Sequence, residues 1–254
     1  MEGAPEDGRG PRGSPTPCAC SKQGSIAIRR LHPRFVVMPK PTKTHLQRVL
    51  ERRSRFLPIP FSDPHESGLP RIPEWKSRGY LPHLDDPRLI QSLTFRLGDS
   101  LPAHVLRCMA ETDDECQRRR MAEEGMDRCH GACWLGRPDV ARWMEDALLR
   151  FDGERYRLLA WCVMPNHVHV LIQPLDVSLG VIVGSWKGWV SHRANRLLGR
   201  RGRFWREDYW DRFIRDACHL GAVIRYIERN PVKAGLVADG DPRSWPWSSA
   251  RWRA

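Results

Sequence analysis

The sequence predicts an α+β domain, in which helices cover one face of an antiparallel sheet. Segments with strand-like and helix-like spacing of apolar residues alternate along residues 76–254. Two of the strands follow each other directly across Pro165 and Asn166, as the strands of a hairpin do. The last two segments have apolar residues at helical spacing and can therefore pack on a sheet.

The predicted elements begin with a strand over 89–97, where β-branched and aromatic residues are mixed. A helix over 138–151 has an apolar stripe behind Pro138, a residue favoured early in helices. The last helix ends at Asn230 because a residue before proline avoids helical geometry. The full order is strand, helix, helix, strand, strand, helix and helix, at residues 89–97, 101–124, 138–151, 156–164, 167–173, 178–198 and 216–229.

The composition favours a polyanionic partner. The formal net charge is +12 and the pI is about 9.8. Clustered Lys and Arg side chains gain free energy when they displace counterions from phosphates, but composition alone does not separate DNA from RNA or a membrane surface. Residues 1–75 hold most of the prolines and predict a basic, loosely ordered extension before a domain over 76–254.

Location and thiol chemistry also follow from the composition. No stretch approaches the roughly 20 apolar residues of a spanning helix, and the N-terminal residues lack the apolar core of a signal peptide, so we expect a cytoplasmic protein without a membrane partner. The eight cysteines are too sparse for a disulfide scaffold and are expected to be free thiols. Cys129, His130 and Cys133 could begin a zinc site, but no second cysteine pair stands at the required distance.

The segment MPNHVHVLIQP is the most informative part of the chain. Strand alternation sends His167 and His169 to one face and Val168 and Val170 to the other. Two imidazoles are costly to bury on an apolar strand, whereas their nitrogens can converge on one cation. A metal site is therefore predicted, although a histidine-triad hydrolase is disfavoured because Leu171 stands where a third histidine would lie.

The nucleophile candidates are few because the chain has only four tyrosines. Tyr156 opens a core strand and Tyr80 precedes the first strand, which leaves Tyr209 and Tyr226. Tyr226 stands beside the apolar stripe of the last helix, and Asn230 follows one turn later. Tyr226 can supply a nucleophilic oxygen, and Asn230 a third metal ligand through its side-chain carbonyl.

Four motifs carry a resemblance to a known family: MPNHVHVLI, FWREDYWDRFIRD, YIERNPVKAGLV and WPWSSA. From about residue 79 to 252 the sequence resembles the REP-associated tyrosine transposases, which belong to the single-tyrosine HUH transposases of insertion sequences. The resemblance implies a ferredoxin-like or RRM-like fold, the HUH endonuclease fold. It also implies a divalent metal, Mg²⁺ or Mn²⁺, held by His167, His169 and a ligand one turn after the tyrosine. That ligand is commonly Gln in relatives and is Asn230 here.

The activity that the resemblance implies is attack by Tyr226 on a phosphate of single-stranded DNA. The product is a 5′-phosphotyrosine with a free 3′-hydroxyl, which permits strand joining without ATP. The expected substrate contains a hairpin or palindromic repeat. Relatives act as a monomer or as a homodimer, and both states stay open for this chain.

Basic and aromatic residues are interleaved between residues 186 and 215, a mixture that suits a single strand of DNA. Cations would follow the phosphates, and some rings would stack on exposed bases. The candidate contacts are Lys187, Arg193, Arg200, Arg201, Arg203, Arg206, Trp205 and Tyr209.

Two other functions remain open at this stage. A DNA- or RNA-binding regulator could keep the fold and lack cleavage. A metal-dependent phosphoesterase could activate water, and Tyr226 would then be an ordinary helix residue. Formation of a covalent protein–DNA adduct separates the transposase from the second alternative, and any metal-dependent cleavage separates it from the first.

Overall fold

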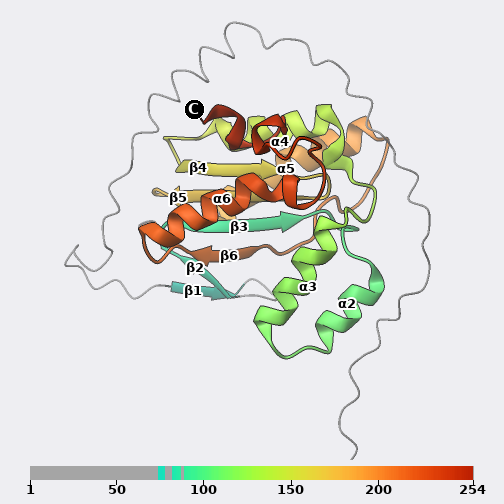
Figure 1. The fold of residues 1–254 in the computed structure, drawn as a ribbon, viewed down its shortest axis with the longest axis horizontal. Coiled ribbons are helices and arrows are strands. Elements are labelled where there is room, and N and C mark those ends of the chain that lie inside the picture. Colours follow the sequence, from blue (N-terminus) through green and yellow to red (C-terminus); the bar gives the residue numbers. More distant parts are fainter. Residues whose placement is uncertain (1–73, 78–81, 87–88, 254) are drawn as a thin grey trace, which may run out of the picture. The chain divides into compact units, whose positions relative to one another are not determined.

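The computed structural model describes residues 74–77, 82–86 and 89–253 (Figure 1). The predicted extension over 1–75 lies outside these residues except for its last two positions, so its loose order stays a prediction. The first described element is a separate antiparallel ribbon of β1 (Glu74–Ser77) and β2 (Pro82–Asp85), which the sequence had not indicated. No helix in the described ranges is long and apolar enough to cross a membrane.

The main sheet has four strands in the order β4-β5-β3-β6, and all neighbours are antiparallel. The strands are β3 (Gln91–Arg96), β4 (Tyr156–Val163), β5 (His167–Pro174) and β6 (Trp210–Phe213). Along the chain they follow the ferredoxin-like sequence of strand, helices, strand, strand, helix and strand. The α+β class and the ferredoxin-like antiparallel sheet are therefore confirmed.

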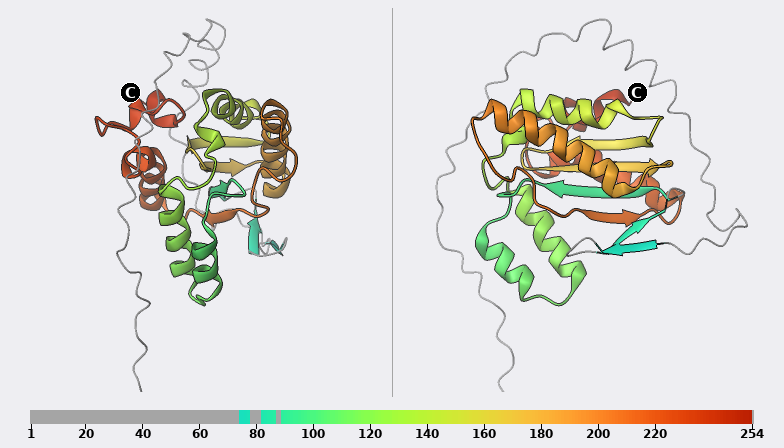
Figure 2. Two further views of the ribbon diagram at one scale, coloured as in Figure 1. Left: turned by 90° about the vertical axis from the view of Figure 1, so that its right-hand side faces the viewer. Right: turned by 180° about the vertical axis from the view of Figure 1, so that it is seen from behind.

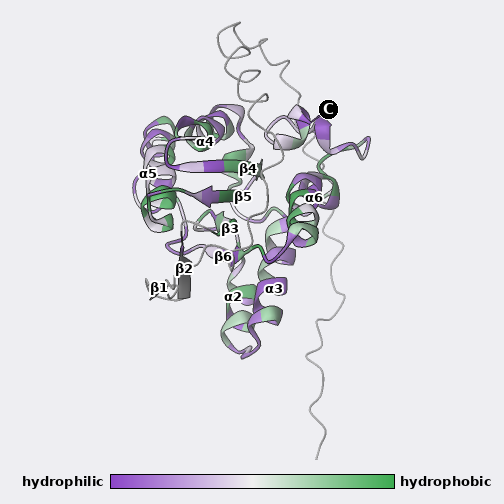
Figure 3. Ribbon diagram, turned by 90° about the vertical axis from the view of Figure 1, so that its left-hand side faces the viewer, coloured by the Kyte–Doolittle hydropathy of each residue, from purple (hydrophilic) through white to green (hydrophobic). Residues whose placement is uncertain are grey.

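Five helices surround this sheet in the described part of the chain. They are α2 (Ala103–Ala110), α3 (Glu115–Asp127), α4 (Pro138–Arg150), α5 (Leu179–Leu197) and α6 (Ala217–Lys233). The expectation that the helices cover one face is correct for α4 and α5, but α6 lies over the opposite face (Figures 2 and 3). The domain thus has three layers, with the sheet in the middle.

Three element predictions needed correction. The segment 210–213, predicted to lie in a loop between two helices, forms β6 because it pairs with the edge of β3, with Trp210 opposite Thr94. The helix predicted over 101–124 is two helices, since Asp114 caps the second by accepting a hydrogen bond from the backbone of Cys116 at 2.8 Å.

The last helix does not end before Asn230 but continues through Pro231 to Lys233. Proline removes one backbone donor in the final helical turns. The hydrogen bonds around it remain: the amide of Ala234 donates to Asn230 at 2.9 Å, and that of Leu236 donates to Pro231 at 2.8 Å. A proline near the end of a helix therefore leaves the helix intact here.

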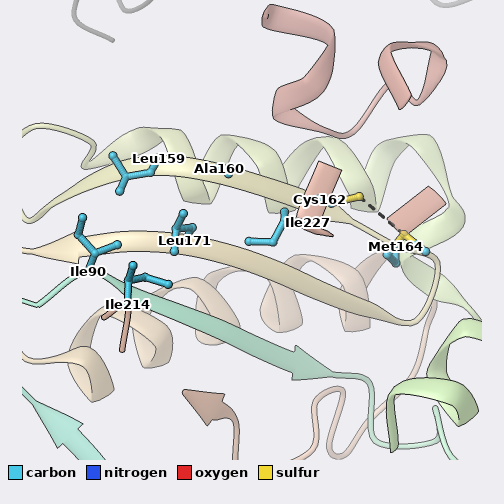
Figure 4. Packing of buried hydrophobic residues seen from close by; sticks show 8 residues of the cluster. All are labelled: Ile90, Leu159, Ala160, Cys162, Met164, Leu171, Ile214 and Ile227. Carbon is cyan, nitrogen blue, oxygen red and sulfur yellow. Dashed lines mark hydrogen bonds between the residues drawn. The ribbon is translucent and has the colours of Figure 1, made fainter. Parts of the chain in front are cut away.

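The two faces of the sheet carry different cores. On the α4–α5 face, the ring of Trp186 packs against Phe95 and, edge-on, against Tyr156, with centroids 6.3 and 5.1 Å apart. On the other face, Leu171 and Ile227 of α6 belong to a cluster of buried apolar side chains (Figure 4). This second cluster consists of Ile90, Leu159, Ala160, Cys162, Met164, Leu171, Ile214 and Ile227.

The C-terminal segment that contains WPWSSA holds α6 against the sheet. Trp247 accepts the backbone hydrogen bond of Val163 at 2.9 Å, so this segment extends the edge of β4. Ser249 donates to the buried carboxylate of Glu228 on α6 at 2.7 Å, and Arg253 forms an ion pair with the same carboxylate. Glu228 is thus the main polar connection between α6 and the C-terminus.

We expect Glu228→Ala to lower the free energy of unfolding by about 1–3 kcal/mol, because it leaves Ser249 and Arg253 without their acceptor. Urea unfolding monitored by circular dichroism measures the change. Glu207→Ala is the matched control, since its ion pair with Arg203 is exposed and should contribute less than about 1 kcal/mol. Equal effects in the two variants would contradict a role of Glu228 in anchoring α6.

Candidate metal and nucleophile site

His167 and His169 lie on the α6 face of β5, as the strand alternation predicted. Their exposed fractions are 0% and 2%, and their Nε2 atoms are 3.0 Å apart. The rings stand nearly perpendicular, at 88°, with centroids 4.7 Å apart. Both imidazoles therefore point one nitrogen at the same small volume.

The orientation of His167 is fixed by its neighbour Asn166. Asn166 donates through Nδ2 to the carbonyl of His130 at 3.2 Å, which leaves its Oδ1 facing Nδ1 of His167 at 2.7 Å. An amide oxygen accepts only, so His167 carries its proton on Nδ1 and keeps the Nε2 lone pair free. Ligating histidines are commonly held in this way by an acceptor behind the ring.

His169 has a different second partner, the hydroxyl of Thr94, which lies 2.9 Å from its Nδ1. Thr94 stands directly opposite His169 in the register of β3 and β5. A hydroxyl can donate or accept, so His169 can place its proton on either nitrogen. With Nε2 protonated it donates to His167, and with Nδ1 protonated it presents a second lone pair to a cation.

Burial keeps both histidines neutral. It is the main cause that lowers the pKa of His167 well below its usual value and the pKa of His169 to about 3. The positive charge of Lys233 lowers both further, and Arg119 adds to the effect at His169. Neutral imidazole is the form that binds metals.

Tyr226 and Asn230 come from α6 and complete the group. The ring of Tyr226 meets that of His169 edge-on, with centroids 5.5 Å apart and an angle of 75°. Asn230 is 1% exposed and donates to the carbonyl of Tyr226 at 3.1 Å; its side chain also acts to raise the pKa of the neighbouring His169, but its buried Oδ1 makes no hydrogen bond of normal geometry. The structure thus brings together all four residues predicted as nucleophile and ligands.

The phenol of Tyr226 is not activated by its surroundings. Burial is the main cause that raises its pKa above the usual value, and the negative charges of Glu123 and Asp127 add to it. Both acids belong to α3, and Asp127 forms an ion pair with Lys233 of α6 at 2.8 Å. α3 therefore borders the site, a contribution that the sequence had not indicated.

The donor set fits a divalent cation. Two nitrogens that each lie about 2.1 Å from one cation, at nearly a right angle, are about 3 Å apart, which matches the two histidines. The unpartnered Oδ1 of Asn230 is an orphaned acceptor of the kind a cation would satisfy. No group of three or more His, Cys, Asp or Glu side chains suited to a metal occurs in the described ranges.

Three of the predicted DNA-contact residues, Trp205, Tyr209 and Lys187, are buried or hold the backbone in place. Trp205 and Tyr209 are each 6% exposed, and Trp205 packs edge-on against Phe95 at 5.3 Å, so neither ring offers a face for a base. The structure corrects the expectation of base stacking for both. Lys187 donates to the carbonyls of Arg206 and Glu207 at 2.7 and 2.8 Å, and burial lowers its pKa to about 8. It holds the loop after α5 in place.

The arginines remain available on the surface. Arg193 on α5 lies over the ring of Trp189 at 4.4 Å, and Arg200 lies over Phe204 at 5.7 Å. Arg201, Arg203 and Arg206 are exposed. The backbone of Arg206 donates to Arg96 at 2.9 Å, which places this loop at the end of β3 where Arg96 pairs with His167.

The cysteines in the described ranges are free, as expected. The thiol of Cys133 donates to the carbonyl of Cys129 at 3.0 Å, and no metal cluster forms there among the described side chains. This loop instead provides the carbonyl of His130 that orients Asn166.

Residues 149–230 match the model of a family described as "Transposase IS200 like". This stretch contains the histidine pair, Tyr226 and Asn230. This match agrees with the resemblance of the sequence to REP-associated tyrosine transposases. A REP-associated tyrosine transposase of Haemophilus influenzae is 29% identical over 105 residues, which are 37% of this chain and 58% of that relative. The chain thus matches less than two thirds of this relative's length.

Two solved structures are also similar to this chain. One is a REP-associated tyrosine transposase bound to a REP hairpin, with 16% identity and a TM-score of 0.42, covering 72% of this chain and 82% of that one. The other is a transposase from Deinococcus radiodurans, with 18% identity and a TM-score of 0.32, covering 61% of this chain and 96% of that one.

The buried histidines predict a pH dependence of stability in EDTA. The unfolded chain binds protons at both histidines near pH 6.5, but the folded state excludes them because both folded pKa values are lowered. The free energy of unfolding is therefore highest above pH 6.5. Below pH 6.5 it falls, for each histidine, by up to about 1.4 kcal/mol per pH unit. Urea unfolding at pH 7, 6 and 5 measures the slope.

His169→Asn serves as the control for this slope. This variant removes one of the two side chains that bind a proton in the unfolded chain but not in the folded protein. It should therefore lose about half of the pH dependence, while the other titrating groups stay unchanged. The same slope in this variant would show that the imidazoles are not the source.

Proposed function

We propose that this protein is a DNA transposase or single-strand endonuclease, which cleaves and rejoins single-stranded DNA through Tyr226 with a divalent metal. The observation that carries the proposal is the convergence of His167, His169, Tyr226 and Asn230, with two imidazole nitrogens 3.0 Å apart and the tyrosine ring beside them. A phenol oxygen beside a predicted cation site fits nucleophilic attack on a phosphodiester. The similarity of residues 149–230 to IS200-like transposases supports the same reaction.

In this reaction the oxygen of Tyr226 loses its proton and attacks phosphorus. A 5′-phosphotyrosine forms, and the 3′-oxygen leaves and takes up a proton as the 3′-hydroxyl. Rejoining reverses these steps with a new 3′-hydroxyl. The bond energy is kept in the phosphotyrosine, so no nucleotide cofactor is required.

The chain's own residues explain why a cation is needed. The raised pKa of Tyr226 leaves its phenol protonated at neutral pH, because burial and the acids of α3 disfavour the phenolate. His167, His169 and Asn230 would hold Mg²⁺ or Mn²⁺, which supplies positive charge for the phenolate and for the non-bridging phosphate oxygens. Asn166 and Thr94 orient the two imidazoles from behind.

The substrate follows from charge and from the relatives. The net charge of +12 and the exposed arginines after α5 suit a DNA strand. The relatives associated with REP sequences suggest a hairpin or palindromic repeat as the first substrate to test. The tyrosine and both histidines lie together within one chain, which supports a site that a monomer can complete. Because the proposed substrate is DNA, we expect the protein to act inside the cell.

A water-activating phosphoesterase is the second candidate. The same ligands would support it, but the position of Tyr226 against His169 would then have no chemical use. A regulator without cleavage would not need the unpartnered Asn230 carbonyl. Both alternatives predict no covalent adduct.

Tyr226→Phe should abolish the covalent protein–DNA adduct and preserve DNA binding, because it removes one oxygen and keeps the ring. The assay incubates the protein with a labelled single-stranded hairpin and Mn²⁺, followed by denaturing electrophoresis and mass spectrometry of the linked peptide. Tyr209→Phe is the control and should still form the adduct, since Tyr209 is buried and no ring contact with the histidine pair is observed for it. An adduct on another tyrosine would redraw the site, and cleavage without any adduct would favour the phosphoesterase.

Mn²⁺ should stabilise the folded protein through His169. At about 100 times the dissociation constant, a single bound ion adds about 2.7 kcal/mol to the free energy of unfolding. His169→Asn should remove most of this stabilisation in a thermal unfolding assay without DNA. His192→Asn is the control because this exposed histidine lies on α5, on the other face of the sheet. Equal stabilisation of both variants would place the ion elsewhere.

A further inference from the structure

Arg96 is a buried cation on the same face of the sheet as the histidine pair. It lies on β3 directly opposite His167 in the antiparallel register, so the two side chains leave the sheet on one side. Only 4% of Arg96 is exposed. The proposed reaction assigns it no role.

The guanidinium has few partners. One nitrogen donates to the hydroxyl of Ser100 at 3.1 Å, and the group lies 5.8 Å from the ring centroid of Trp210. Its Nε is buried without a hydrogen-bond acceptor. No carboxylate among the described residues forms an ion pair with it, and its pKa is lowered to about 10, first by burial and then by the charge of Arg206.

Two buried carboxylates of the described residues, in contrast, are paired with arginines. Glu145 is held by Arg251 at 2.7 Å, and Glu228 is held by Arg253 and Ser249. Burial of a charge is costly unless an opposite charge or several hydrogen bonds compensate it. Arg96 has no opposite charge and only one side-chain hydrogen bond, to Ser100. Its environment is therefore that of a cation that binds an anion not present in the free protein.

The chemistry of the missing anion follows from the guanidinium. Its planar fork offers several donors and matches the oxygens of a phosphate, which it can bind through two hydrogen bonds. One of these donors, the Nε–H, has no acceptor here, and Nη1 donates to Ser100. The neighbouring Arg206 is also positive, so an anion bound at Arg96 would be attracted by both guanidinium groups.

We propose that Arg96 binds a backbone phosphate of the DNA strand beside His167, with Ser100 and Trp210 holding the guanidinium in place. This proposal rests on the proposed DNA cleavage, because it assumes that a strand reaches the histidine face. Trp210 packs on the apolar cluster of Leu101, Ala122 and Met126 from the α2–α3 region. Trp210 and the α2–α3 side chains that it packs on must therefore move when the DNA strand binds at Arg96.

The first test removes the charge. Arg96→Gln is made in the Tyr226→Phe background, so that binding of a single-stranded hairpin oligonucleotide is measured without cleavage. Loss of one phosphate contact should weaken binding and reduce the slope of log affinity against log salt by about 0.7. The control is Arg142→Gln, at an exposed position on α4, which covers the opposite face of the sheet. It should leave the affinity and the salt slope unchanged.

A structural role predicts a different pattern. If Arg96 only supported the fold, Arg96→Gln would lower the unfolding temperature of the DNA-free protein and leave the salt slope unchanged, and that result would overturn the proposal. We expect the unfolding temperature to stay the same or rise, because an uncompensated buried charge is removed.

A second measurement uses the unaltered side chain and does not depend on the folding of a variant. The Nε–H resonance of Arg96 in ¹⁵N-arginine-labelled protein should shift when the oligonucleotide binds, since this atom has no acceptor in the free protein. No shift at saturating DNA would overturn the proposal.

The adduct assay separates this proposal from the proposed function. If the wild type forms the Tyr226 adduct but Arg96→Gln keeps the full salt slope, the phosphate contact fails and the cleavage reaction stands. If no adduct forms but the slope and the resonance respond as expected, the phosphate contact stands and cleavage fails.

Discussion

The antiparallel register between β5 and β3 is the constraint on which the site depends. It sets His169 opposite Thr94 and His167 opposite Arg96, all on the α6 side, while Val168 and Val170 enter the core beneath α4 and α5. A slip of one residue would send every side chain of β5 to the other face. The apolar residues that fix the register therefore also fix the histidines, and stability and site geometry have the same cause.

The second constraint is the position of α6 on the opposite side of these strands. Ile227 anchors the helix in the apolar cluster, and Glu228 ties it to the C-terminal segment. Tyr226 and Asn230 lie on either side of these two anchors, separated by one helical turn, so they are held toward β5. The WPWSSA motif thus acts on the site indirectly, through the packing of the helix that carries the tyrosine.

Much of this arrangement could be predicted from the sequence, because it depends on local periodicity. The strand alternation of the HVHV segment and the one-turn spacing of Tyr226 and Asn230 need only the geometry of a strand and a helix. β6 could not be predicted, since its four residues, WDRF, form a strand only through pairing with β3. The burial of Trp205 was also hidden, because a basic, aromatic segment has the same composition whether its rings face DNA or the core. Asn166 and Thr94 had no signal of their own, since their roles arise from contacts across the fold.

On the face of the sheet that carries His167 and His169 lie two polar groups of opposite kind, an acceptor without a donor and a cation without an anion. The buried carbonyl of Asn230 has no donor, and the buried guanidinium of Arg96 has no anion. Between them stand two neutral imidazoles whose lone pairs can accept a cation. A cation alone would satisfy Asn230 and the imidazoles but add repulsion at Arg96, and an anion alone would do the reverse. A divalent metal together with a phosphate would satisfy both groups at once, so the charge pattern of the free protein is that of a site where metal and DNA favour each other's binding.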